Sequence, residues 1–373
     1  MKRIKIIHVL QSVGGVDVYL RLITENLDSE IFENIIIHQK DDSKKKYFNN
    51  VGQEIKQYYV PVQREINLFK DFQALYKTVS ILKKEKPDII HAHSAKGGIL
   101  GRAASVFYKV NVLHTPHAYS YLSAQSKIKR TLFLNIERFF KKFNSYLLAT
   151  SESEKSRGIN DVGYNINKAL KFNNSILPLN NFEAKPHVSL PQNYICTVGR
   201  PSYQKNIEMM VNVIYEVKKT IPNIYLVIMG VGEYSPNKDS VIKQISKLNL
   251  DNNILLIDWV EREKIISIIK QSLLYVSTSR YEGLPYSIIE SLSLSKSCIV
   301  TDCDGNRDLV KDNYNGFIIR NESVNDMATK IIELYSDENK RSKFAANSYE
   351  LFLKNFNLVS NIKELEKIYQ TYS

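Results

Sequence analysis

Short apolar runs rich in β-branched residues alternate along this chain with amphipathic helical stretches, and this alternation limits its fold more than any other feature. Helical periodicity between the runs is clear over Leu68–Lys84, where apolar positions recur every three or four residues. Strands that alternate with helices predict a parallel sheet joined by crossover helices. The strand-like runs of the first half are Ile4–Leu10, Asn34–His38, Asp88–Ala92, Val112–Thr115 and Tyr146–Thr150.

The same alternation starts again after Leu177–Gln192, a stretch with Pro178, Pro186 and Pro191 that is typical of a linker. The chain has 373 residues, which suits two domains. We expect α/β domains at 1–185 and 190–355, with a C-terminal helix at about 356–373 packing back on the first. The second set of strand-like runs is Tyr194–Val198, Ile224–Met229, Ile254–Ile257, Leu274–Ser277, Cys298–Thr301 and Gly316–Ile319.

Composition indicates a folded protein of a reducing compartment. Hydrophobic residues make up 43% of the chain, too many for disorder. Cys196, Cys298 and Cys303 have no paired spacing, so neither disulfides nor a zinc–cysteine site is expected. The first residues read as a strand rather than a targeting segment, and no run reaches the roughly 18 apolar residues of a membrane span. We expect a cytoplasmic protein, at most peripheral on the inner face of the cell membrane.

The net charge of +12 comes from the first half of the chain. Residues 1–185 carry 29 Lys and Arg against 17 Asp and Glu, whereas residues 186–373 carry 22 of each. A one-sided basic surface indicates an anionic partner, such as nucleic acid, a membrane leaflet or a phosphorylated acceptor. The alternative is a lysine-rich protein whose lysines are simply solvated. Nucleic acid is disfavoured, because no recognition motif accompanies the charge.

Glycine and polar residues follow the predicted strands, where open parallel sheets bind ligands. The strongest such segment is Ser279–Glu290. In it, Gly283 allows backbone to approach a ligand closely, and Pro285 suits the first turn of a helix whose N–H groups attract phosphate. Glu282 and Glu290 lie eight residues apart and can contact two ends of one extended ligand. Either glutamate alone is more often a solvated surface charge.

This segment resembles family 4 glycosyltransferases in the pattern Glu-x7-Glu of SRYEGLPYSIIE and in IVTDCDGNRDLVKDNYNGFII, which follows it. VGRPSYQKN (Val198–Asn206) is similar to that family's Arg and Lys diphosphate clamp, and Gly14-Gly15-Val16 resembles its first glycine loop. HAHSAKGGILGR and HTPHAYSY look like the subgroup that builds bacterial capsule, O-antigen and glycan repeat units on a lipid carrier. The resemblance implies the GT-B fold, two Rossmann-like parallel-sheet domains that face each other across a cleft.

The resemblance also implies roles for individual residues. Arg200 and Lys205 would hold the donor diphosphate by charge-assisted contacts. Glu282 would bind a sugar hydroxyl and Glu290 the ribose. The implied donor-binding set is Gly14, Gly15, Arg200, Lys205, Gly230, Gly232, Trp259, Glu282, Gly283, Leu284, Pro285, Tyr286 and Glu290. Asp258 departs from the family, which often has Gly before the Trp, and this leaves recognition of the base open.

His117 in HTPHA would lie beside the donor sugar, where imidazole can donate or accept a proton. It completes the implied catalytic set with Glu282, Arg200 and Lys205. The alternative for His117 is a structural histidine bonded to backbone, and His91, His93 and His114 are more often of that kind. Their spacing disfavours zinc.

The implied reaction is retaining and metal-independent, and it moves a hexose or N-acetylhexosamine from a UDP-sugar to a polyprenyl-diphosphate-linked glycan. The nucleotide sugar is a substrate, so no cofactor is expected. One alternative is manganese at Asp302-Cys303-Asp304, the Asp-x-Asp pattern of GT-A enzymes. Others are an epimerase or phosphorylase on the same fold. A dinucleotide oxidoreductase is disfavoured, because Gly14-Gly15 lacks the G-x-G-x-x-G spacing.

The segment 127–143 is basic and rich in Phe and Leu. One interpretation is a helix that rests on an anionic membrane, where a lipid-linked acceptor lies. The other is a helix buried on its apolar side, with lysines on its outer face.

Overall fold

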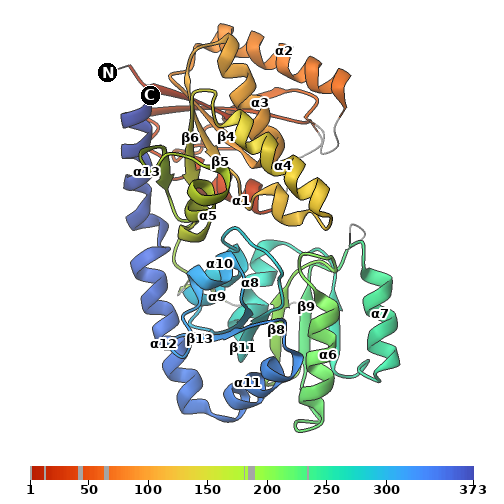
Figure 1. Cartoon of the computed structure of the whole chain (residues 1–373). Coiled ribbons are helices and arrows are strands. Elements are labelled where there is room, and N and C mark those ends of the chain that lie inside the picture. Colours follow the sequence, from red (N-terminus) through yellow and green to blue (C-terminus); the bar gives the residue numbers. More distant parts are fainter. Residues whose placement is uncertain are drawn as a thin grey trace. The chain divides into compact units, whose positions relative to one another are not determined.

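The computed structural model describes residues 2–11, 14–40, 45–62, 67–179, 181–183, 190–232 and 235–373. The chain forms two compact units, and each contains one parallel sheet (Figure 1). Unit 1 comprises Met1–Asn174 with Leu358–Ser373, and unit 2 comprises Ser175–Asn357. Of the proline-rich stretch predicted as a linker, residues 180 and 184–189, with Pro186, lie outside the described residues.

Unit 1 contains a seven-stranded sheet in the order β3-β2-β1-β4-β5-β6-β7. All five strands predicted from the sequence are present. The sequence did not reveal β3, a short and partly exposed edge strand, or β7, which has three residues. The strands are β1 Ile4–Val9, β2 Phe32–His38, β3 Lys56–Tyr59, β4 Ile89–His93, β5 Asn111–Thr115, β6 Ser145–Ala149 and β7 Ala169–Lys171.

The helical prediction at 68–84 is confirmed as α2, where the Asn67 side chain caps the first turn by accepting from Lys70 N. The described part of unit 1 also contains three short helical turns, η1 to η3. The helices are α1 Gly15–Thr24, α2 Leu68–Glu85, α3 Ser94–Phe107, α4 Lys127–Phe140, α5 Glu152–Arg157 and α13 Leu358–Tyr372, and the turns are η1 Ser120–Ser123, η2 Gly158–Val162 and η3 Ile166–Lys168.

The last helix, α13, packs on the sheet of unit 1. Buried Tyr369 lies 2.7 Å by its hydroxyl from His91 Nδ1, and its ring packs on Phe32. Asn111 Nδ2 donates to Tyr372 O over 2.9 Å. The chain therefore returns from unit 2 to complete unit 1, although 278 positions separate His91 from Tyr369 and 261 separate Asn111 from Tyr372.

Unit 2 contains a six-stranded parallel sheet in the order β10-β9-β8-β11-β12-β13, and all six of its predicted strands are present. The strands are β8 Ile195–Val198, β9 Leu226–Met229, β10 Ile254–Ile257, β11 Leu274–Ser277, β12 Ser297–Thr301 and β13 Gly316–Ile319. The helices are α6 Ile207–Lys218, α7 Lys238–Lys247, α8 Arg262–Gln271, α9 Tyr286–Ser293, α10 Asp304–Leu309, α11 Val324–Ser336 and α12 Glu338–Asn355.

Both sheets reverse their strand order once. In unit 1 the reversal lies between β1 and β4, and in unit 2 it lies between β8 and β11. Loops that leave the carboxyl ends of such neighbouring strands diverge to opposite faces of the sheet, and the crevice between them is where open α/β sheets bind ligands. The loops after β1, β4, β8 and β11 therefore lie where a ligand is expected to bind. Among the described residues, no helix has both the length and the apolar character that crossing a membrane requires.

Candidate active site

The loops after β8 and β11 bring Lys205 and Glu282 together at the carboxyl edge of the unit 2 sheet. Lys205 Nζ lies 2.6 Å from Glu282 Oε1. Gln204 Nε2 donates to the other carboxylate oxygen over 3.3 Å. Glu282 is buried, with 7% of its surface exposed. Two predicted site residues, 77 positions apart in the sequence, therefore form one ion pair at the switch point.

Local packing fixes the backbone of this loop. The Thr278 hydroxyl lies within 3.0 Å of the carbonyl oxygens of both Lys205 and Asn206. A Cβ on Gly199 would lie 3.0 Å from Lys205 Cγ, so glycine there leaves room for the lysine side chain. Asn206 has a φ of 49°, in the left-handed region that asparagine tolerates, and α6 begins at the next residue. Residues just after β8 and β11 therefore fix the backbone from which the flexible Lys205 side chain extends.

Arg200 follows the same strand and is partly exposed. Its guanidinium has no ion pair or hydrogen bond with any other residue that the structure describes. Its backbone N lies 3.8 Å from the point where a Cβ of Gly230 would be. An unpaired cation on a strand end is a ready contact for an anionic ligand.

Gly232 and Trp259 are in contact beyond β9 and β10. A Cβ on Gly232 would lie 2.3 Å from Trp259 Cδ1 and 2.6 Å from Asp258 Oδ1. Trp259, the one tryptophan of the chain, is 59% exposed as a residue. Gly230, at a φ of 94°, turns the chain away from β9. A large flat side chain left in solvent at this edge gives a surface on which a base can stack.

The loop that contains Gly283, Leu284 and Pro285 leads into α9, which begins at Tyr286. Pro285 is the N-cap residue and precedes the helix, so its prediction as part of the first turn was wrong by one position. Gly305 of α10 packs directly on this loop, because a Cβ there would lie 2.4 Å from Gly283 O. The amino end of α9 is thus held at the carboxyl edge of β11.

Glu290 lies on α9 and pairs with Arg262, the first residue of α8, across 2.6 Å between Nε and Oε1. Burial raises the pKa of the Glu290 carboxyl, and the nearby guanidinium opposes that shift. Arg262 was not predicted as a partner of Glu290, because no motif marks it. A carboxylate accepts several hydrogen bonds, so this pairing leaves Glu290 able to bind a hydroxyl as well.

Asp302 and Asp304, the Asp-x-Asp pattern, both contact one guanidinium. Arg307 Nη1 lies 2.7 Å from Asp302 Oδ1, and Arg307 Nη2 contacts Asp304. A cation of the protein itself therefore occupies the position that the manganese interpretation would give to a metal. Within the described ranges, the residues close enough to share a metal ion are His8, His91 and His93 instead.

In unit 1, Gly14 follows β1 with a φ of 60° and caps α1, which begins at Gly15. A Cβ on Gly14 would meet nothing within 4 Å, so the turn lies open. Ser12 and Val13, just before it, lie outside the described residues.

His117 and Ala118 follow β5, and both have positive φ, 53° and 78°. Left-handed backbone at residues other than glycine costs on the order of 1–3 kcal/mol each and is concentrated at functional sites. Buried Glu154 braces the turn, because its Oε1 accepts from Ala118 N over 2.8 Å and its Oε2 accepts from Thr150 N over 2.7 Å. The strained turn therefore holds the His117 ring in one place.

Histidines cluster around His117. Burial lowers the pKa of His8 to about 4 and that of His117 to about 3, so these rings are neutral near pH 7. His91 has both ring nitrogens engaged, by Tyr369 and Thr115, and has a structural role. His93 lies between His8 and His117, at 3.1 and 3.3 Å between nitrogens. The rings therefore form hydrogen bonds with one another and with polar side chains.

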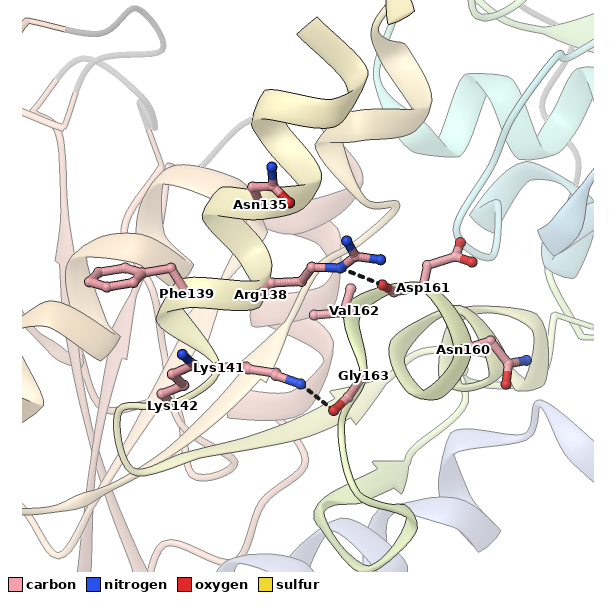
Figure 2. Close-up of a pocket in the computed structure, with 9 residues that line it drawn as sticks. All are labelled: Asn135, Arg138, Phe139, Lys141, Lys142, Asn160, Asp161, Val162 and Gly163. Atoms are coloured by element: carbon pink, nitrogen blue, oxygen red, sulfur yellow. Dashed lines mark hydrogen bonds between the residues drawn. The ribbon is translucent and has the colours of Figure 1, made fainter. Parts of the chain in front are cut away.

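A basic hollow of about 490 Å³ lies beside α4 (Figure 2). Arg138 and Lys141 extend across it to the backbone oxygens of Asp161 and Gly163. Burial and the charges of Arg138 and Lys142 lower the pKa of Lys141. On the inner side of α4, buried Glu137 pairs with Arg102 across 2.9 Å. On its outer side, the apolar residues left exposed are Ile128, Leu132 and Phe139.

Two sequence families match the chain, one to each half. The family described as "Glycosyltransferase Family 4" matches residues 13–168, and "Glycosyl transferases group 1" matches residues 180–351. A UDP-Gal:alpha-D-GlcNAc-diphosphoundecaprenol alpha-1,3-galactosyltransferase of Escherichia coli is 28% identical over 98% of this chain and 97% of its own. The capsular polysaccharide biosynthesis glycosyltransferase CapM of Staphylococcus aureus is 25% identical over 86% of this chain and 88% of its own.

Solved structures show the same fold. Sucrose-phosphate synthase from Thermosynechococcus elongatus superposes with a TM-score of 0.84 at 16% identity, over 99% of each chain. HepE of Anabaena, in complex with UDP and glucose, superposes with a TM-score of 0.81 at 16% identity, again over 99% of each chain. The predicted GT-B fold is confirmed by these likenesses and by the two parallel sheets.

Proposed function

We propose that this chain, which belongs to the family 4 glycosyltransferases, transfers a hexose or N-acetylhexosamine from a UDP-sugar to a polyprenyl-diphosphate-linked glycan. The observation that carries the proposal is the Lys205–Glu282 pair at the switch point of unit 2. Arg200 follows the same strand as Lys205, and its guanidinium has no partner among the described residues. The names of two relatives support it: one uses UDP-Gal and a diphosphoundecaprenol acceptor, and the other serves capsule synthesis. A chain with these partners would work at the cytoplasmic face of a membrane.

In this proposal, Arg200 and Lys205 offset the charge of the donor diphosphate as it leaves. Glu282 accepts a hydrogen bond from a sugar hydroxyl, Glu290 binds the ribose, and the uracil stacks on Trp259. Support comes from where these groups lie, because the cations and Glu282 follow β8 and β11 and the indole lies exposed against Gly232. Gly14, Gly15 and the loop before α9 would add backbone N–H groups for the phosphates.

We propose that transfer retains the configuration at the anomeric carbon. The bond from C1 to the diphosphate oxygen breaks, and the acceptor oxygen bonds to C1 on the same face. The acceptor's proton passes to an oxygen of the leaving diphosphate. Retention by a double displacement would need a carboxylate nucleophile. This proposal instead uses Glu282, which already accepts from Lys205 and Gln204, to hold a sugar hydroxyl. The protein then contributes positioning and electrostatic stabilisation.

Changing Lys205 to Ala should lower kcat by about 100-fold or more, because a cation that stabilises the leaving group is lost. The assay uses UDP-galactose and GlcNAc-diphosphoundecaprenol as the first donor and acceptor, with release of UDP as the readout. Lys219→Ala is the matched control, since Lys219 forms a surface ion pair with Glu216. Thermal unfolding of both variants checks that they fold. Near-normal turnover in Lys205→Ala would contradict the assigned role.

We also propose that the reaction needs no metal ion, because Arg307 already pairs with both carboxylates of the Asp-x-Asp pattern. Full turnover is expected in the presence of EDTA. Loss of turnover that manganese or magnesium restores would refute this part of the mechanism.

We propose further that the outer face of α4 rests on an anionic membrane, with exposed Ile128, Leu132 and Phe139 among cationic side chains. The chain should float with vesicles that contain phosphatidylglycerol and should not float with neutral phosphatidylcholine vesicles. Arg130→Glu with Lys142→Glu should abolish flotation, whereas Lys219→Glu with Lys247→Glu in unit 2 should not. Flotation that the α4 charge reversals leave unchanged would remove this contact.

A further inference from the structure

A row of hydrogen-bonded side chains crosses four neighbouring strands of unit 1, and the proposed transfer assigns no role to any of them. Asn34 lies on β2, His8 on β1 and His93 on β4, and His117 follows β5. Asn34 Oδ1 lies 3.0 Å from His8 Nε2. His8 Nδ1 lies 3.1 Å from His93 Nε2, and His93 Nδ1 lies 3.3 Å from His117 Nε2.

The ring geometry suits N–H···N hydrogen bonds along this row. The planes of His8 and His93 differ by 23°, with centroids 5.4 Å apart. Those of His93 and His117 differ by 19°, with centroids 5.6 Å apart. Rings that are nearly parallel but more than 5 Å apart meet edge to edge, which is where the nitrogen lone pairs and N–H groups point.

Each neutral imidazole has one donor and one acceptor nitrogen. The hydrogen bond at the Asn34 end of the row therefore determines which nitrogen of every ring carries the proton. Asn34 turns its carbonyl oxygen toward His8, so His8 donates from Nε2 and its Nδ1 accepts. His93 then donates from Nε2 to His8, and its Nδ1 accepts from Nε2–H of His117. The remaining nitrogen of His117, Nδ1, is left with a lone pair.

We propose that Asn34, His8 and His93 are positioning residues that fix the tautomer of His117, so that His117 Nδ1 accepts a hydrogen bond from a hydroxyl of a sugar substrate. The inference rests on the proposed function, because it names the substrate group that His117 receives. His117 Nδ1 has no partner among the residues described, and His117 as a whole residue is partly exposed. The braced left-handed turn at His117 and Ala118 keeps that nitrogen in one direction.

The burial of these residues supports a fixed arrangement. His8 and His93 are fully buried, so they exchange hydrogen bonds with one another rather than with water. Burial lowers the pKa of both, which keeps each ring neutral with a single proton to place. A metal ion shared by His8, His91 and His93 would have to displace these hydrogen bonds, and the polar partners of His91 also leave it no free nitrogen.

Two substitutions of His93 distinguish a role in fixing the His117 tautomer from a role in packing alone. Asn places its amide near the former Nδ1, facing His117, whereas Gln places its amide near the former Nε2, facing His8. Both remove the ring, so a purely structural role would suffer similarly in each. We expect His93→Gln to lower kcat by about tenfold, the order expected for loss of one hydrogen bond. His93→Asn, whose amide oxygen can accept from His117, should retain most of the kcat that His93→Gln loses.

Nitrogen NMR of the full chain labelled with ¹⁵N-histidine reads the tautomer without any sugar present, and His117→Gln assigns the signal. Wild type and His93→Asn should show His117 protonated at Nε2, and His93→Gln should show a mixture of tautomers. A wild-type His117 protonated at Nδ1, or equal losses of kcat in the two variants, would overturn the inference. If the chain shows the expected tautomer but transfers no sugar from any UDP-hexose, the proposed function is contradicted. The inference that the row of side chains fixes the His117 tautomer would still hold.

Discussion

The parallel direction of every strand is the constraint on which the rest of the structure depends. Because all strands of a sheet run the same way, the loops that leave their carboxyl ends collect at one edge, and the reversal of strand order opens a crevice there. Lys205 and Glu282 meet at such a point although 77 positions separate them. In unit 1 the same geometry aligns Asn34, His8 and His93, which come from three adjacent strands. Without parallel pairing, neither group of side chains would assemble.

The two units offer a ligand different chemistry. The edge of the unit 2 sheet carries cations and carboxylates, and Lys205 and Arg262 each pair with a buried glutamate. Such groups suit a diphosphate, whose charge must be offset as it leaves. The edge of the unit 1 sheet carries imidazoles that burial keeps neutral. Neutral rings add no net charge, but their donor and acceptor nitrogens point in fixed directions. Selecting a hydroxyl requires such a directional hydrogen bond.

Much of this could be predicted from the sequence. Apolar β-branched runs predicted 11 strands, and the structure contains all of them. The motif around Glu282 was predicted to follow a strand end, and it follows β11; that this loop binds a ligand stays a prediction. The edge strands β3 and β7 escaped notice, since a short or exposed strand leaves little apolar signal. The pairing of Glu290 with Arg262, the pairing of both Asp-x-Asp carboxylates with Arg307, and the hydrogen bond between His8 and Asn34 depend on how helices pack and on strand register, which spacing along the chain does not encode.

Fluorescence of Trp259 during titration with UDP tests most directly whether the carboxyl edge of the unit 2 sheet binds the nucleotide. As the one tryptophan of the chain, and 59% exposed, it reports on that edge without any label. A saturable change in its emission with UDP, absent with inorganic diphosphate, is the predicted result. Emission that stays unchanged at UDP concentrations that raise the thermal unfolding midpoint would place the nucleotide elsewhere and contradict the account.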